Sequence, residues 1–349
     1  MKNHAASAPG LEAANTCITA RAQICFIQTI LAALAALMLS ACGGGNSGAV
    51  PVTNIAPRED NPTGEFEVVG TIRSRILDEI SGISSGFENH LLVHNDDGEA
   101  VIHAISSTGD LIATVRIRGA RNRDWEDLAS IRSDDADVLV IGDIGDNLAL
   151  HKSITVYLVE IPPPDADGFY PREIGVLHKA KLKFPDGARD SEAMAYDPAS
   201  ESLLFLSKRD RPPRLYGISR QLLMSDKKHT LEFLGEIAEL RPPTAVELVK
   251  DLAGGAWISQ PTSMDISADG RQAVILTYRS VYRYQRDNSE TWLDAFRRPP
   301  VEYLGPPGTR DEAIAFGTEG DSIWVTTETL PAPLFRLVLP AADYPVSIP

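Results

Sequence analysis

The fold is decided by the stretch Asp190-Ser-Glu-Ala-Met-Ala-Tyr-Asp197, followed by Ser202-Leu-Leu-Phe-Leu-Ser207 and Arg214-Leu-Tyr-Gly-Ile218. In the first run a glutamate is followed by small residues. The second run is short and apolar. Polar turn residues separate the runs, which is typical of antiparallel strands. The stretch therefore predicts three consecutive β-strands of one sheet.

The same pattern occurs five times between residues 76 and 338. Each unit opens with a short run, continues with a polar turn and an apolar strand, and adds further strands. Four-stranded units repeated around an axis are the architecture of a β-propeller. We therefore predict an all-β fold, a propeller with five four-stranded blades. The openings are Glu79-Ile-Ser-Gly-Ile83, Glu126-Asp-Leu-Ala-Ser130, Glu192-Ala-Met-Ala-Tyr196, Ser263-Met-Asp-Ile-Ser267 and Glu312-Ala-Ile-Ala-Phe316.

Two features bear on the closure of this ring. The fifth unit lacks a fourth strand, and the run Glu65-Phe-Glu-Val-Val-Gly70 is a strand without a unit. We expect this N-terminal strand to complete the last blade. The two middle units carry insertions, Pro162 to Gly175 and Arg241 to Pro261. A sixth, degenerate blade within these insertions is the alternative.

The chain begins with a segment typical of export. An apolar run from Ile24 to Leu39 ends in Leu39-Ser-Ala-Cys42, which resembles a bacterial lipobox. The resemblance implies cleavage before Cys42 and a lipid on that cysteine, so the membrane is an expected partner through this anchor. We expect a cell-envelope protein, with the periplasmic side of the outer membrane favoured. The predicted parts are a signal peptide (1–41), a flexible tether (42–63), one propeller domain (64–340) and a C-terminal tail (341–349).

The composition is that of a globular protein with an acidic surface. The 349 residues include 48 Asp and Glu against 33 Lys and Arg, a formal net charge of −15. Nucleic-acid binding depends on basic residues that contact phosphates, so we expect no nucleic-acid partner. The 3 Cys residues are Cys17 and Cys25 in the leader and Cys42, so no disulfide is expected in the mature chain. We expect a monomer whose surface favours cations.

Polar and charged residues recur where the units open. The start of the first strand and the end of the second lie at the same end of an antiparallel pair. Because the first strand of a propeller blade lines the central channel, both positions are expected to ring one mouth of that channel. They pair as Glu79 with Asn95, Glu126 with Asp143, Glu192 with Lys208, Ser263 with Arg279 and Glu312 with Glu328.

Three interpretations of this mouth stay open. In the first, Arg and Asp residues of the loops that precede the first strands form ion pairs across blade boundaries, and their role is only to stabilise the ring. In the second, oxygen ligands without Cys or clustered His bind Ca²⁺ or Mg²⁺ rather than Zn²⁺. In the third, such a metal polarises a lactone, ester or phosphoester beside an anion-binding Lys and Arg. The loop residues of the first interpretation are Arg123, Arg189 and Arg310 with Asp124, Asp190 and Asp311.

The hypothesis carried forward is a divalent-cation site, with Ca²⁺ as the expected ion and ligand positions beside it. The ligand is expected to be a small molecule or an envelope protein, and the residues leave open whether the protein is an enzyme. The candidate metal ligands are Glu79, Glu126, Glu192, Glu312, Asn95 and Asp143. The candidate ligand-binding residues are Lys208, Arg279, Glu328 and Asp127.

Five short motifs carry a family resemblance. The body resembles a family of bacterial secreted and lipoprotein β-propellers over roughly residues 76–338. This resemblance implies the propeller fold and brings no established activity. The motifs are E-x-S-G-I (79–83), H-N-D-x-G (94–98), N-x-D-W-E-D (122–127), G-D-I-G-D-N (142–147) and D-x-E-A (190–193).

The acidic mouth is more remotely similar to the Ca²⁺ sites of gluconolactonase, regucalcin, paraoxonase and phytase propellers. That similarity implies a calcium-dependent hydrolase, acting as a lactonase, esterase or phosphoesterase, as the alternative function. Those families use Asn ligands and mostly six blades, whereas this chain is rich in Glu and has five visible units.

The lipobox resemblance predicts the behaviour of a single variant. We expect Cys42→Ala to leave the membrane fraction, or to remain uncleaved, because the acyl chains are the only strong membrane attachment in the sequence. Fractionation of expressing cells with an antibody to the body measures this. Wild-type protein found wholly in a soluble fraction would contradict the lipobox assignment.

Overall fold

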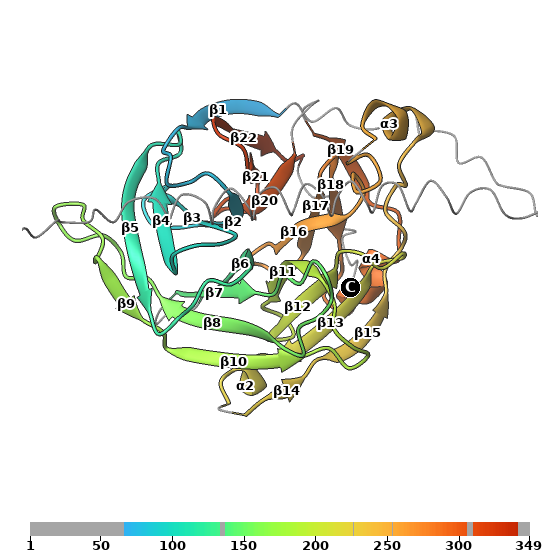
Figure 1. Ribbon diagram of the computed structural model, residues 1–349, viewed down its shortest axis with the longest axis horizontal. Coiled ribbons are helices and arrows are strands. Elements are labelled where there is room, and N and C mark those ends of the chain that lie inside the picture. The colour runs from blue at the N-terminus through green and yellow to red at the C-terminus, as the bar shows by residue number, and fades with distance from the viewer. Residues whose placement is uncertain (1–65, 133–136, 226, 253, 306–309, 341–349) are drawn as a thin grey trace, which may run out of the picture. The chain divides into compact units, whose positions relative to one another are not determined.

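The computed structural model describes residues 66–340, except 133–136, 226, 253 and 306–309. Within these residues, five sheets are arranged around a common axis as the blades of a β-propeller (Figure 1). The predicted all-β fold and the five blades are confirmed, and the described residues contain no sixth sheet. The predicted signal peptide, Cys42, the tether and the tail lie outside the described residues.

Each blade consists of four antiparallel strands, which follow one another from the channel outward. Blade 1 contains β2 (Ile80–Ser85), β3 (Leu91–Asn95), β4 (Val101–Ile105) and β5 (Leu111–Arg118), and blade 2 contains β6 (Trp125–Ile131), β7 (Val138–Asp143), β8 (Ile154–Glu160) and β10 (His178–Lys183). Blade 3 contains β11 (Ser191–Asp197), β12 (Ser202–Ser207), β13 (Arg214–Ser219) and β15 (Glu232–Glu236). Blade 4 contains β16 (Pro261–Ile266), β17 (Gln272–Thr277), β18 (Ser280–Gln285) and β19 (Val301–Leu304), and blade 5 contains β20 (Asp311–Phe316), β21 (Ser322–Thr327), β22 (Ala332–Val338) and β1 (Glu67–Ile72).

The predicted insertions add short elements and form no blade. The first contains β9 (Glu173–Gly175), which pairs in parallel with β5 of blade 1, and blade 2 gains β14 (His229–Thr230) in the same way. The second contains α3 (Ala245–Lys250), which begins with a capping box between Thr244 and Glu247. No helix of the described residues is long and apolar enough to cross a membrane. The other helices within the described residues are α2 (Arg220–Leu223) and α4 (Trp292–Phe296).

The hydrophobic core is divided into five wedges, one at each interface between blades. The strand β12 shows why its sequence is apolar at consecutive positions. Leu203 and Phe205 pack towards blade 2, whereas Leu204 and Leu206 pack towards blade 4. Since both faces of such a strand are buried, the usual alternation of apolar and polar residues is lost.

The N-terminal strand closes the ring as predicted. Strand β1 pairs antiparallel with β22 and forms the outer edge of blade 5. At this seam the backbone N–H of Thr71 donates to the carbonyl of Thr108 in blade 1, with an N to O distance of 3.1 Å. Only glycine fits at position 70, because a Cβ there would overlap the Thr108 backbone.

Removal of residues 64–71 should destabilise the whole propeller, because it deletes β1 and exposes the edge of β22. Removal of residues 43–57 should leave the melting temperature nearly unchanged, since that segment has no core-forming pattern. Thermal unfolding of the two truncated proteins measures the difference. Equal melting temperatures for both would refute the closure by β1.

Candidate cation and ligand site at the channel mouth

The inner hairpin of every blade contains a β-bulge at the same place. In all five blades the pairing register between the first and second strands skips one residue near the start of the first strand. A bulge re-aims the side chain of the extra residue, and bulges often lie beside functional sites. The skipped residues are Ser81, Glu126, Glu192, Thr262 and Glu312.

Four of these five residues line one cavity of about 160 Å³ at the mouth of the channel. The lining contains seven carboxylates and one ammonium group, that of Lys208. The complete lining is Glu79, Ile80, Ser81, Asp96, Asp124, Glu126, Asn147, Glu192, Lys208, Tyr278, Glu312 and Glu328.

The cavity brings together six of the ten predicted site residues. Four are the glutamates proposed as metal ligands, and the other two are predicted ligand-binding residues, Lys208 and Glu328. The bulge register corrects two details of the repeat alignment, of which the first is that Thr262, and not Ser263, is the bulged residue of blade 4. The second is that the residue of blade 1 equivalent to Glu126 is Ser81, and Glu79 reaches the cavity from two positions earlier. The four glutamates are Glu79, Glu126, Glu192 and Glu312.

Three predicted residues lie outside this lining. The amide of Asn95 donates to the carbonyl of Ile76 at 3.0 Å, and the carboxylate of Asp143 lies 3.7 Å from the Arg123 guanidinium. Arg279 donates to the carboxylate of Glu247 at 3.0 Å. In blade 1 the residue after Asn95, Asp96, reaches the cavity instead. In blade 4 the residue before Arg279, Tyr278, reaches it.

Asp127 also lies outside the cavity, and its surroundings give it a different role. The side chain is fully buried, and its carboxylate accepts hydrogen bonds from the backbone N–H groups of Met194 (2.7 Å) and Met264 (3.1 Å). It also accepts from the Ser263 hydroxyl at 2.8 Å and from the Leu128 N–H at 2.9 Å. Burial raises the pKa of Asp127, and these hydrogen bonds oppose that shift. Asp127 therefore joins the inner strands of blades 2, 3 and 4.

The floor of the cavity is a buried chain of charged and polar groups. The Lys208 ammonium forms an ion pair with Glu192 and donates to the Tyr278 hydroxyl at 3.0 Å. Tyr278 in turn hydrogen-bonds to Glu312. Burial raises the pKa of Glu192 to about 7, with Lys208 opposing, and burial with the charge of Glu192 raises the pKa values of Glu126 and Glu312 further above their usual range. Glu192 therefore forms the ion pair that balances Lys208, while burial and the neighbouring negative charge favour the protonated forms of Glu126 and Glu312.

Gly145 marks where the floor meets the rim. A Cβ at this position would overlap the carboxylates of both Glu126 and Asp124. The glycine therefore makes room for two acidic groups in close proximity. Burial and the charge of Asp190 raise the pKa of Asp124 to about 6, so this residue is mostly ionised at neutral pH.

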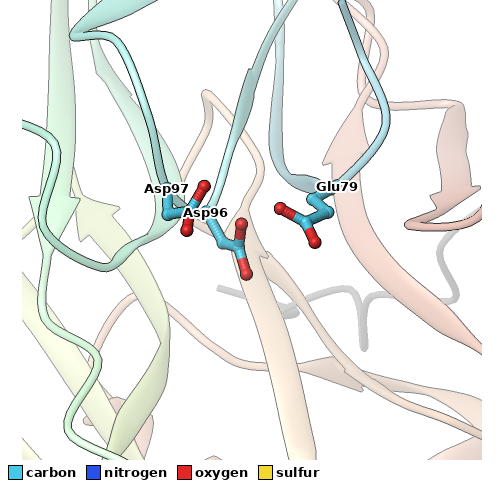
Figure 2. A group of neighbouring side chains, drawn as sticks. All are labelled: Glu79, Asp96 and Asp97. Atoms are coloured by element: carbon cyan, nitrogen blue, oxygen red, sulfur yellow. The ribbon is translucent and has the colours of Figure 1, made fainter. Parts of the chain in front are cut away.

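The rim carries a second acidic group, formed by Glu79, Asp96 and Asp97 (Figure 2). One carboxylate oxygen from each residue lies within 4.8 Å of the others. Oxygens that share one Ca²⁺ at about 2.3–2.6 Å can be separated by at most about 5 Å, so this spacing fits a hard cation. Burial and the charge of Glu79 raise the pKa of Asp96 to about 7. Sequence reasoning missed Asp96 as a ligand, although it lies in the H-N-D-x-G motif.

The arginines of the entering loops pair with carboxylates other than those predicted. Arg123 approaches Asp143 and Arg310 lies 3.6 Å from Asp251, while Arg189 pairs with two aspartates. Of these arginines, Arg123 also opposes the raised pKa of Asp124, which lines the cavity. The two aspartates beside Arg189 are Asp186 (2.8 Å) and Asp210 (2.6 Å).

Comparisons with known proteins give a structural likeness at low sequence identity and no sequence match. No family model matches the chain, and no curated protein matches it in sequence. Among solved structures, the chain is similar to a gluconolactonase from Xanthomonas campestris that is important in glucose secondary metabolic pathways. The TM-score is 0.42 with 12% sequence identity, and the match covers 78% of this chain and 85% of that one.

The position of Asp127 predicts a structural effect without a binding effect. We expect Asp127→Ala to reduce the free energy of unfolding by about 3–5 kcal/mol, because it leaves buried N–H groups of two other blades without an acceptor. Asp127→Asn should cost less, since its amide oxygen still accepts. Urea unfolding measures both, with the exposed Asp167→Ala as the control. A stable Asp127→Ala protein would show that the three-blade link is dispensable.

Proposed function

We propose that this protein is an envelope-anchored β-propeller lipoprotein that binds a divalent cation, Ca²⁺ first, at its acidic channel mouth. The observation that carries the proposal is the gathering of seven carboxylates and one ammonium group on one small cavity. Like charges held this close destabilise the folded ring unless they are paired, protonated or bound to a cation. A cation that binds only the folded ring would relieve this repulsion.

The rim supports a more specific placement of the cation. Glu79, Asp96 and Asp97 offer three carboxylate oxygens at a spacing that suits one ion. Glu126, Glu192 and Glu312 are less suitable as ligands, because Lys208 already lies among them and burial raises the pKa values of Glu126 and Glu312. The rim would therefore hold the ion, and a small ligand beside it would meet the Lys208 ammonium and the Tyr278 ring on the floor.

A calcium-dependent hydrolase at the same mouth is the second candidate. Its support is that Asp96 and Glu192 both have pKa values raised to about 7. A group with such a pKa can donate or accept a proton near neutral pH, as general acid–base catalysis requires. Screening the calcium-loaded protein on lactones, aryl esters and phosphoesters tests it. Turnover that Glu192→Gln abolishes would favour the enzyme, and no turnover on all three classes would favour a binding protein.

The envelope location rests on the lipobox-like run before Cys42. A lipid on Cys42 would hold the propeller close to a membrane, on the periplasmic side of the outer membrane, through the tether of residues 42–63. The protein needs no other attachment in this arrangement, and it acts there as a monomer.

We expect Ca²⁺ to stabilise the chelator-treated protein by about 2.7 kcal/mol at a concentration one hundred times its Kd. Asp96→Asn combined with Asp97→Asn should abolish this gain, because two of the three rim carboxylates are lost. Glu126→Gln with Glu192→Gln should instead lower the metal-free stability, because it leaves the buried Lys208 ammonium without its ion-pair partner Glu192. Thermal unfolding with and without Ca²⁺ measures these effects, with Asp167→Asn as the control. An unmoved melting temperature and no heat of binding would overturn the cation proposal.

The same protein should respond to pH in a defined direction. Folding raises the pKa of Asp96 from 3.8, and that of Glu192 from 4.5, to about 7. Protons therefore bind the folded state more tightly, so metal-free stability should fall as the pH rises from about 4 to 7. Ca²⁺ must displace these protons, so its affinity should be weaker at pH 6 than at pH 8. Calorimetry in buffers of different ionisation enthalpy measures the protons released.

A further inference from the structure

Large apolar side chains are exposed on two segments of the mouth face. Leu148 and Leu150 are 76% and 71% exposed at the tip of the connection between β7 and β8. Val249 and Leu252 are 74% and 91% exposed in and after α3, and Val246 is 61% exposed. Single exposed apolar residues are normal, but such clusters mark an interaction site when they lie together around a cavity.

The first segment is fixed beside the cavity by the hydrogen bonds of its neighbours. Asn147 lines the cavity, and its side-chain oxygen accepts from Arg209 at 2.5 Å. The buried carboxylate of Asp146 accepts from the N–H groups of Leu150 (2.9 Å) and His151 (2.6 Å). The loop is thus held from beneath while both leucines remain exposed.

The second segment is held on the other side of the mouth. Glu247 of α3 pairs with the buried Arg279 at 3.0 Å, and Asp251 pairs with Arg310 at 3.6 Å. The Arg310 guanidinium lies 5.8 Å from the ring centre of Tyr278, which lines the cavity. No residue of α3 is buried, so its charged residues attach it to the body and its valines stay exposed.

The charge of the cavity decides what these apolar segments can bind. A lipid surface with anionic headgroups would be repelled by the carboxylates of the rim. A Lys or Arg side chain would be attracted, and a cavity of about 160 Å³ can hold its charged end. Apolar residues flanking such a side chain would meet the exposed leucines and valines. Binding energy and charge recognition would then come from adjoining parts of one surface.

We propose that the mouth face docks a protein segment that presents a Lys or Arg side chain between apolar residues. The basic group enters the acidic cavity, and the flanking residues pack on Leu148 and Leu150 on one side and on Val249 and Leu252 on the other. This interaction goes beyond cation binding and does not depend on it, because the basic group itself supplies the positive charge.

Selection from a displayed library of random peptides on the immobilised full chain, in the presence of a chelator, tests the proposal. The enriched peptides should contain Lys or Arg flanked by apolar residues. Their affinity should fall at least about tenfold for Leu148→Ser with Leu150→Ser, and likewise for Val249→Ser with Leu252→Ser. Replacing the basic residue of a peptide by Gln should have a similar effect. Unchanged melting temperatures of the variants show that they are folded.

Phe169→Ser is the matched control, because Phe169 is 69% exposed in the connection after β8, at the opposite end of its blade. Its peptide affinity should equal that of wild type. The proposal fails if no peptide is enriched, if the enriched peptides lack a basic residue, or if they bind the mouth variants as well as wild type. It also fails if the mouth variants lose binding to phosphatidylcholine or phosphatidylglycerol vesicles instead, since this would assign the surface to lipid. Because chelator is present throughout, failure of Ca²⁺ binding does not affect the result.

Discussion

The carboxylate of Asp127 is the contact on which the rest of the propeller most depends. Its oxygens accept from backbone N–H groups of β11 and β16, strands of two other blades, and from the hydroxyl of Ser263. The same hydroxyl accepts from the N–H of Ile314 in blade 5 at 3.3 Å, so the link continues around the axis. These bonds occupy the axis below the mouth. The mouth is therefore a cavity with a floor, in which charged groups can be held away from bulk water.

The repeated β-bulge directs side chains of the inner strands into the cavity above this axial packing. Four of the five bulges place a side chain of an inner strand in the lining of the mouth, and in three of these blades that side chain is a glutamate. A buried lysine balances one of these charges, and burial raises the pKa values of the other two glutamates, which favours their uncharged forms. The rim is more open and keeps more of its charge. The floor thus limits the cost of folding, while the rim attracts positive charge.

The repeats made the fold predictable from sequence, and the bulges limited the prediction of the site. Blade number, strand order and closure by β1 follow from a pattern of strands and turns that is repeated five times along the sequence. The glutamates of the mouth were found for the same reason. Asn95 and Arg279 were chosen in place of their neighbours Asp96 and Tyr278, because no local pattern in the sequence announces the inserted residue of each inner hairpin. Asp127 was predicted to bind a ligand. In the sequence, a carboxylate that accepts hydrogen bonds from the backbone of distant strands cannot be distinguished from one that binds a ligand.

A partner bound to the exposed apolar residues would also change the electrostatics of the acidic cavity. An occupant that covers Leu148 and Leu252 would exclude water from the cavity and so strengthen every charge interaction inside it. The groups that respond are those with pKa values near 7, Asp96 and Glu192. A positive charge in the cavity, whether metal ion or basic side chain, favours their ionised forms and releases protons. Fewer protons must be displaced as the pH rises, so the affinity for either occupant increases with pH. The stability of the empty protein falls over the same pH range. An occupant therefore stabilises the protein most at the pH values where the empty mouth destabilises it most.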